Sequence, residues 1–191
     1  DRVKALGLEG NTYIIYTSDN GAVPVMPPKR FYKVGSNFPL SRGKWDAMEG
    51  GIRVPFIISG PKIPNGSISN TPISGVDILP TIQALVSNNV ELTKTMDGGS
   101  FMNNLFKDQN SKVIRNNDFL IFHLPFRRGS FNPHSAIIKD NFKLIKFTNT
   151  NNLLLFDLNK DINEKNNISN QFQKKTKELD LLLEKYLNGQ K

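Results

Sequence analysis

A nearly continuous apolar run over residues 11–17, followed at once by the turn sequence Ser-Asp-Asn-Gly at 18–21, constrains the fold most strongly. β-Branched and aromatic residues fill the run, which predicts a β-strand. Because the run shows no polar face, we expect the strand to be buried on both faces. Strands of this kind belong to parallel sheets covered by helices. The run therefore predicts an α/β fold with a central strand at this position.

Two further elements in the first part of the chain fit this fold. Residues 52–59 predict a short strand that ends at a Gly-Pro pair. Residues 76–86 predict a short helix with Pro80 in its first turn, where a missing N–H costs little. Residues 22–43 contain several Pro and Gly and predict a long surface loop, a kind of segment that often carries function.

The periodicity changes beyond residue 110, and we place a domain boundary there. Residues 1–110 are expected to hold the sheet with its flanking helices. Residues 111–191 are expected to form a small antiparallel sheet packed by one amphipathic helix near the C-terminus. A two-residue hairpin turn is predicted at Asp140 and Asn141. The predicted strands of the small sheet are 119–123, 135–139, 142–147 and 153–158.

Charge and composition argue against several classes of protein. The formal net charge is +8, but the C-terminal lysines alternate with Asn and acidic residues. No RNA-binding aromatic motif or zinc-finger spacing occurs, so we expect no nucleic-acid partner, whereas an anionic substrate would suit the positive charge. The absence of cysteine removes disulfides, thiolate metal sites and cysteine nucleophiles. No apolar run approaches the roughly 18 residues of a membrane span.

The first residues predict that the chain starts in the middle of a fold. The sequence opens on Asp1, no methionine occurs before Met26, and no signal peptide is visible. The opening segment is typical of the end of a helix that stops at Gly7.

Asp19 and Asn20 are the first candidate site residues, because they follow directly after the predicted central strand. In open α/β sheets, ligands collect beyond the carboxyl ends of strands. Adjacent carboxylate and carboxamide oxygens suit a hard cation such as calcium or magnesium. An ordinary Asn-Gly turn is the alternative interpretation of the same residues.

Lys44 is the second candidate, because a lysine beside a metal can hold an anionic oxygen as a point charge. On its own, such a lysine is usually a surface residue. Glu49 and Arg53 are four residues apart and are predicted to pair, while Gly50 and Gly51 permit close backbone approach. We interpret these last four residues as architectural.

The two histidines, His123 and His134, are the only side chains here that titrate near neutrality without help. His123 ends an apolar strand, which is a common position for site residues. His134 is expected in a loop rich in Asn, Pro and Gly. A lone histidine is more often structural than catalytic, and the sequence favours His123 over His134 as a site residue.

Taken in order, four segments resemble the type I sulfatases, the formylglycine-dependent group of the alkaline-phosphatase-like superfamily. They are the Thr-Ser-Asp-Asn-Gly turn at 17–21, the Lys and Glu-Gly-Gly-Ile-Arg-Val-Pro block at 43–56, the Asp-Ile-Leu-Pro-Thr helix start at 77–81, and the motifs of 143–167. The resemblance implies part of an alkaline-phosphatase-like mixed sheet with flanking helices, followed by the small antiparallel sheet and its helix.

The resemblance also implies roles for four residues. Asp19 and Asn20 are implied as ligands of one calcium ion, and Lys44 as a contact to the sulfate ester. His123 looks like the histidine that some members bring to the substrate side of the pocket. Lys44 and His123 are therefore the implied catalytic and substrate-binding residues.

The family's formylglycine nucleophile is made within a Cys/Ser-x-Pro-x-Arg motif, which does not occur here. We expect it and the remaining metal ligands upstream, in an N-terminal half of the same polypeptide. The resemblance implies hydrolysis of organic sulfate esters, either sulfated small molecules or sulfated polysaccharides, in the periplasm or outside the cell. The motifs are most similar to those of bacterial polysaccharide-active members. The alternatives are a non-catalytic anion-binding remnant of the scaffold and a phosphatase of the same superfamily.

Overall fold

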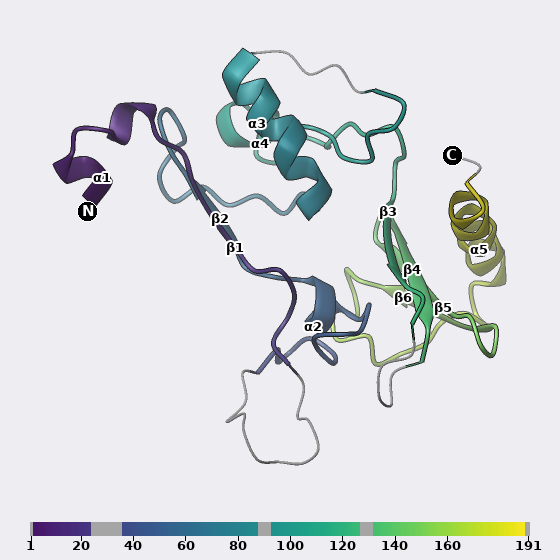
Figure 1. Cartoon of the computed structure of the whole chain (residues 1–191). Coiled ribbons are helices and arrows are strands. Elements are labelled where there is room, and N and C mark those ends of the chain that lie inside the picture. The colour runs from purple at the N-terminus through teal and green to yellow at the C-terminus, as the bar shows by residue number, and fades with distance from the viewer. Residues whose placement is uncertain (1, 24–35, 88–92, 127–131, 190–191) are drawn as a thin grey trace. The chain divides into compact units, whose positions relative to one another are not determined.

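The structure is a computed structural model, and it divides the chain into two compact units (Figure 1). It describes all residues except 1, 24–35, 88–92, 127–131 and 190–191. The first unit comprises Asp1–Tyr16 and Phe56–Asp118, and the second comprises Thr17–Pro55 and Phe119–Lys191. No helix of the described residues is long and apolar enough to cross a membrane.

The first unit contains a two-stranded sheet and its longest helix, α3. β1 (Ile14–Thr17) pairs with β2 (Phe56–Ser59), and both strands were predicted. η2 (Gly75–Asp77) leads into α3 (Ile78–Ser87), and Pro80 lies in the first turn as predicted. The remaining short helices are α1 (Arg2–Ala5), η1 (Glu9–Asn11) and α4 (Met102–Phe106), of which η1 and α4 were not predicted.

β1 is more exposed than its sequence predicts. Ile14 is 50% exposed and Tyr16 is 61% exposed. Within the described residues, β1 has one neighbouring strand in a two-stranded sheet, so little protein covers it. The expectation of a strand buried on both faces is therefore wrong for this structure. Of the predicted 22–43 loop, residues 24–35 lie outside the described residues, and the described parts form neither helix nor strand.

The second unit contains the predicted four-stranded antiparallel sheet, in the order β3-β4-β5-β6. Its strands are β3 (Leu120–Leu124), β4 (His134–Lys139), β5 (Phe142–Phe147) and β6 (Asn152–Asp157). The predicted hairpin turn is present, with Asp140 at a φ of 55°. His134 pairs with Phe147 and begins β4, so its predicted position in a loop is wrong.

The two faces of this sheet pack against different parts of the second unit. The predicted C-terminal helix α5 (Gln173–Leu187) covers one face, which we call the helix face. Ala47 and Met48, just before the short helix α2 (Glu49–Ile52), cover the other, which we call the loop face. Figure 1 shows α5 and α2 on opposite sides of the sheet. Side chains alternate between the faces along each strand.

The compact units do not follow the boundary expected near residue 110. The second unit begins its C-terminal part at Phe119, and it also includes Thr17–Pro55. The assignment of 1–110 and 111–191 as domains stays a prediction. The second unit contains all four predicted site residues, which are Asp19, Asn20, Lys44 and His123.

Candidate functional site

The Asp19–Gly21 turn presents oxygen atoms that are not used in folding. Asp19 is exposed, and its Oδ1 accepts a hydrogen bond from the Asn20 backbone N–H at 3.0 Å. Asn20 Nδ2 donates to the Gly21 carbonyl at 3.0 Å. Among the described residues, no donor bonds to Asp19 Oδ2 or Asn20 Oδ1. The turn therefore offers a carboxylate oxygen and an amide oxygen on consecutive residues.

Backbone hydrogen bonds join this turn to residues 41–53, which we call the Lys44 segment. The Gly21 N–H donates to the Gly51 carbonyl at 2.9 Å, and the Lys44 N–H donates to the Ala22 carbonyl at 3.1 Å. A Cβ atom at Gly21 would overlap the carbonyl oxygen of Gly50, so the approach requires glycine. The structure thus brings together the two segments that hold Asp19, Asn20 and Lys44.

Lys44 lies in a segment of unusual backbone geometry. Its neighbours Arg42 and Trp45 both have positive φ angles, of 59° and 75°. Such angles are uncommon for residues with a Cβ and occur where surrounding contacts fix the chain. Lys44 itself is half-buried, and its ammonium group forms no ion pair within the described part of the chain. Its charge is therefore available to an anion.

A buried ion cluster anchors the same segment to the loop face. The fully buried Lys143 of β5 lies 3.0 Å from Glu49 Oε1 and 2.7 Å from Glu164 Oε1. Glu164 Oε2 accepts the Glu49 backbone N–H at 2.7 Å. Arg53 pairs with Glu49 Oε2 at 3.1 Å, which confirms the predicted pair. Ser41 also donates to the Asn163 carbonyl.

His134 contacts this segment, although the sequence ranks it below His123. The Ala47 N–H donates to His134 Nε2 at 2.9 Å. His134 Nδ1 lies 2.7 Å from the Asn132 carbonyl, which can only accept. These two partners define the neutral tautomer, with the proton on Nδ1. His134 is therefore a buried structural acceptor, 87 residues away from its donor.

His123 lies apart from the Lys44 segment. Its Nδ1 is 2.7 Å from the hydroxyl of Ser135, its partner in the β3–β4 register. His123 shares a face with Ile121, which packs in the cluster of α5, whereas Ala47 and Met48 pack on the loop face. The structure therefore places His123 on the helix face, and its implied catalytic role stays a prediction.

The donor set at the turn fits part of a calcium site. Calcium takes six to eight oxygen ligands, and carboxylate and amide oxygens are among those it prefers. Asp19 and Asn20 supply two such oxygens. Within the described residues, no group of three or more His, Asp or Glu side chains gathers in a way that could hold a metal ion. Asp19 and Asn20 fit as two ligands of a larger set.

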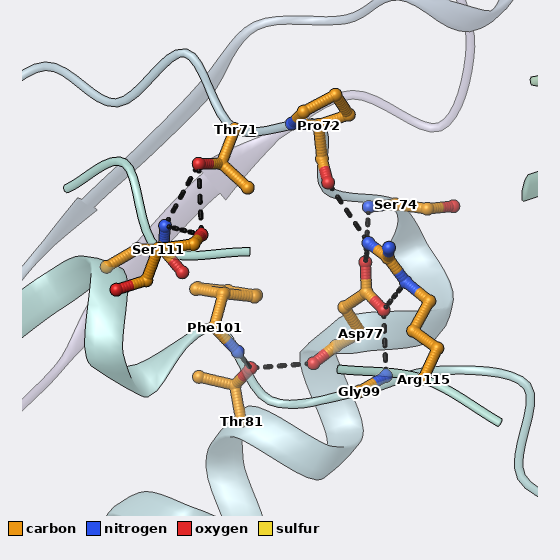
Figure 2. A network of polar contacts seen from close by, with 10 residues as sticks. Thr71, Pro72, Ser74, Asp77, Thr81, Gly99, Phe101, Ser111 and Arg115 are labelled. Atoms are coloured by element: carbon orange, nitrogen blue, oxygen red, sulfur yellow. Dashed lines mark hydrogen bonds and ion pairs between the residues drawn. The ribbon is translucent and has the colours of Figure 1, made fainter. Parts of the chain in front are cut away.

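Asp77 and Arg115 form a second polar network, in the first unit (Figure 2). The Arg115 guanidinium contacts both carboxylate oxygens of the fully buried Asp77, at 2.7 and 2.6 Å. Asp77 also accepts the N–H groups of Ser74 and Gly99, at 2.7 and 2.9 Å. With every oxygen engaged, this network fixes the start of α3, and we assign it a structural role.

Solved structures resemble this chain in fold over nearly its whole length. The structure of Ps i-CgsB in complex with k-i-k-neocarrahexaose has a TM-score of 0.74 and 28% identity, covering 96% of this chain and 38% of that chain. The structure of BT4656 in complex with its substrate D-glucosamine-2-N,6-O-disulfate has a TM-score of 0.69 and 28% identity, covering 97% and 36%. The predicted fold class is confirmed.

The family follows from the sequence. Residues 44–191 match the family model described as N-sulphoglucosamine sulphohydrolase, C-terminal, so the chain belongs to this sulfatase family. The N-acetylgalactosamine-6-O-sulfatase of Bacteroides thetaiotaomicron is 29% identical over 189 residues, which cover 94% of this chain and 37% of that protein. The chain spans about a third of the length of the first curated relatives it matches.

Sequence reasoning missed the side chains that anchor the Lys44 segment. His134 was ranked low, and Lys143 and Glu164 were not singled out for any role of their own. The contacts of His134 and Glu164 with the segment span 87 and 115 residues of chain, and no local pattern encodes them. A lysine inside the apolar run of β5 was the one available signal, because a lysine is almost never fully buried unless it is paired.

Proposed function

We propose that this chain is the C-terminal part of a sulfatase and supplies the lysine and part of the metal site that act on a sulfate ester. The observation that carries the proposal is the pair of backbone hydrogen bonds joining the Asp19–Gly21 turn to the Lys44 segment. They hold together, within one compact unit, an ammonium that has no ion-pair partner among the described residues and two oxygens that accept no hydrogen bond from them. Membership of the sulfatase family supports the same activity.

The chemistry assigned to this chain is electrostatic. Sulfate ester hydrolysis consumes water and releases an alcohol and sulfate, and negative charge develops on the oxygen that leaves sulfur. The Lys44 ammonium would bind a sulfate oxygen and stabilise that charge. Asp19 and Asn20 would hold a calcium ion, which supplies Lewis-acid stabilisation of sulfate oxygens when bound. His123 could donate a proton to the leaving alcohol if the complete protein places it near the ester.

We infer a sulfated sugar as the substrate class. The support is the likeness to BT4656, whose substrate is D-glucosamine-2-N,6-O-disulfate, and to Ps i-CgsB, which binds a neocarrahexaose. If the natural substrate is a sulfated polysaccharide, it is too large to cross a membrane. The enzyme would then work in the periplasm or outside the cell.

The test is sulfate release by the full-length natural protein that contains these residues. The assay uses D-glucosamine-2-N,6-O-disulfate and k-i-k-neocarrahexaose, with 4-nitrophenyl phosphate as the phosphatase comparison. We expect sulfate release, and a fall of about two to three orders of magnitude in Lys44→Ala, because one charge-stabilising donor is lost. Lys160→Ala removes an exposed lysine from the same unit as the control. Phosphate release without sulfate release, or an active Lys44→Ala, would overturn the proposal.

The calcium assignment has its own measurement. Asp19→Ala removes one proposed ligand, so calcium titration of the same protein by calorimetry should show weaker binding. Glu9→Ala removes another exposed carboxylate and serves as the matched control. An unchanged calcium affinity in Asp19→Ala, or an equal loss in both variants, would contradict the assignment.

A further inference from the structure

The backbone between Lys44 and α2 is held by side chains rather than by secondary structure. Three successive N–H groups, of residues 47–49, each donate to a side chain. Ala47 donates to His134 at 2.9 Å, Met48 to Asp46 at 3.0 Å, and Glu49 to Glu164 at 2.7 Å. Two of these acceptors, His134 and Glu164, belong to the C-terminal part of the second unit. The sheet region thus determines where this stretch of backbone lies.

The acceptor on His134 is fixed. The ring is 2% exposed, and its Nδ1–H is committed to the Asn132 carbonyl at 2.7 Å, so only Nε2 can accept the Ala47 N–H. The ring also stacks at a tilt on Phe147, with centroids 5.5 Å apart. The nearest carboxylate oxygen, on Asp46, is 3.6 Å from Nε2 and already accepts the Met48 N–H. The ring therefore cannot tilt away without leaving buried groups unpaired.

The backbone between this contact and Lys44 is short and closely packed. Ala47 is fully buried against the loop face, and only two residues lie between it and Lys44. The Asp46 N–H bonds back to the Gly43 carbonyl at 3.2 Å, closing the backbone around Lys44. A Cβ atom at Gly51 would overlap the Asp46 carbonyl, so α2 packs directly against this turn. A shift at Ala47 is transmitted to Lys44 because the close packing leaves no room to absorb it.

We propose that His134 is a positioning residue for Lys44, acting through the Ala47 N–H. This inference rests on the proposed function, because it assigns His134 to the placement of the ammonium group on the sulfate ester. It makes His134, and not His123, the histidine of the described residues that bears on Lys44. A displacement of about 1 Å at a reacting group can cost about a hundredfold in rate.

Substituting His134 by two different amide side chains tests the acceptor atom Nε2 independently of the rest of the ring. In His134→Gln the side-chain oxygen can reach the place of Nε2 and keep the Ala47 hydrogen bond. In His134→Asn the shorter amide reaches only the place of Nδ1, and the Ala47 N–H is left unpaired. In the full-length natural protein, we expect kcat/KM for sulfate release to fall about 10- to 100-fold in His134→Asn and to stay within a few-fold of wild type in His134→Gln.

The decisive experiment is a double-mutant cycle with Lys44→Ala. If His134 acts by placing Lys44, the loss caused by His134→Asn disappears when Lys44 is already alanine. A role in general stability would give the same fold loss in both backgrounds, and that result would overturn the inference. Thermal unfolding of each variant confirms that folded protein is compared.

The possible failures are distinguishable. Absence of sulfate release in wild type, or an active Lys44→Ala, rejects the proposed function itself. A large effect of Lys44→Ala with an unchanged effect of His134→Asn in that background rejects only the inference about His134. If His134→Asn does not fold, the cycle is run with His134→Leu, which also leaves the Ala47 N–H without its acceptor. A loss that disappears when Lys44 is alanine supports the inference, and a loss that persists, or no loss at all, overturns it.

Discussion

A cluster of four charged residues lies in and beside the loop face. Its two positive charges, on Lys143 and Arg53, balance the two negative charges on Glu49 and Glu164. Lys143 and the two carboxylates are buried, and the contacts between them are 3.0 and 2.7 Å. Burying a charged group costs free energy, and close pairing with an opposite charge offsets this cost. Removing one partner leaves the other charge buried and unpaired, which destabilises the folded state. Substituting one of these residues should therefore destabilise the protein more than substituting an exposed lysine of the same unit.

Lys143→Met tests that cost directly. The substitution keeps the apolar stem but leaves Glu164 without a cation, so we expect a loss of about 3–5 kcal/mol in the free energy of unfolding. Urea denaturation measures it, with Lys160→Met as the control, because Lys160 is exposed and lies 3.7 Å from Asp157. A loss below about 1 kcal/mol would show that the cluster contributes no more than a surface ion pair.

Glu164 gives the cluster a dependence on pH. Burial raises the pKa of Glu164 above its ordinary value of 4.5, outweighing the lowering by Lys143 and by the Glu49 N–H. The folded state therefore binds the proton more tightly than the unfolded state. The contribution of Glu164 to stability falls as pH rises from 4.5 to the raised pKa, and is constant above it.

Glu164→Gln removes this titration and keeps an acceptor for the Glu49 N–H. The stability of wild type relative to Glu164→Gln should therefore decrease as pH rises through the range just above 4.5, and then level off. Urea denaturation of both proteins at closely spaced pH values measures the difference. A difference that increases with pH in this range would mean that pairing with Lys143 outweighs burial.

At the scale of elements, α5 and β5 are joined by apolar packing and by one three-membered ion network. Leu179 and Leu183 of the helix pack on the helix face. Lys146 of β5 lies 2.8 Å from both Asp180 and Glu184. Burial lowers the pKa of Lys146, but the hydrogen bonds and charges of Asp180 and Glu184 outweigh it and raise the pKa above 10.5. The network is thus intact at neutral pH and weakens only above 10.5.

Lys146→Met should cost about 1 kcal/mol at neutral pH, because the carboxylates of the network are partly exposed and screened by solvent. The measurement is urea denaturation at pH 7 and again in high salt, where the difference from wild type should shrink. Leu183→Ala, which removes packing without charge, is the comparison and should be insensitive to salt. An equal salt response of the two variants would contradict an ionic contribution.

Local patterns account for most of the elements but for few of the connections between them. Strand runs, the turn at Asp140 and the helical spacing after Phe172 are properties of neighbouring residues, and each was predicted. The bond from Ala47 to His134 depends on how the chain returns after 87 residues, which no local pattern encodes. For the same reason the sequence favoured His123, whose strand is conspicuous, over the residue that contacts the Lys44 segment. The exposure of β1 depends on its neighbouring strands and not on its composition.

At the scale of the whole molecule, α3 leaves an apolar stripe uncovered within the described structure. Leu79 and Val86 of α3 are 61 and 83% exposed and lie seven residues apart on one helix face, and Val76 of the preceding η2 is 48% exposed. Contiguous exposed apolar residues mark interaction surfaces or aggregation sites. The exposed strand residues Ile14 and Tyr16 belong to the same unit. The 191-residue chain alone should therefore self-associate.

Leu79→Lys with Val86→Lys tests whether the α3 stripe carries this association. Each added ammonium would have to be desolvated at a contact between copies, so the double variant should shift toward monomer at equal concentration. Asn65→Lys with Asn70→Lys adds the same charge at exposed polar positions outside α3, in the same unit, and is the matched control. Sedimentation velocity over a range of concentrations distinguishes the outcomes. A wild-type chain that stays monomeric throughout would contradict the expectation of self-association. Equal dissociation of the two double variants would attribute the effect to net charge, because only the first pair lies on the apolar stripe.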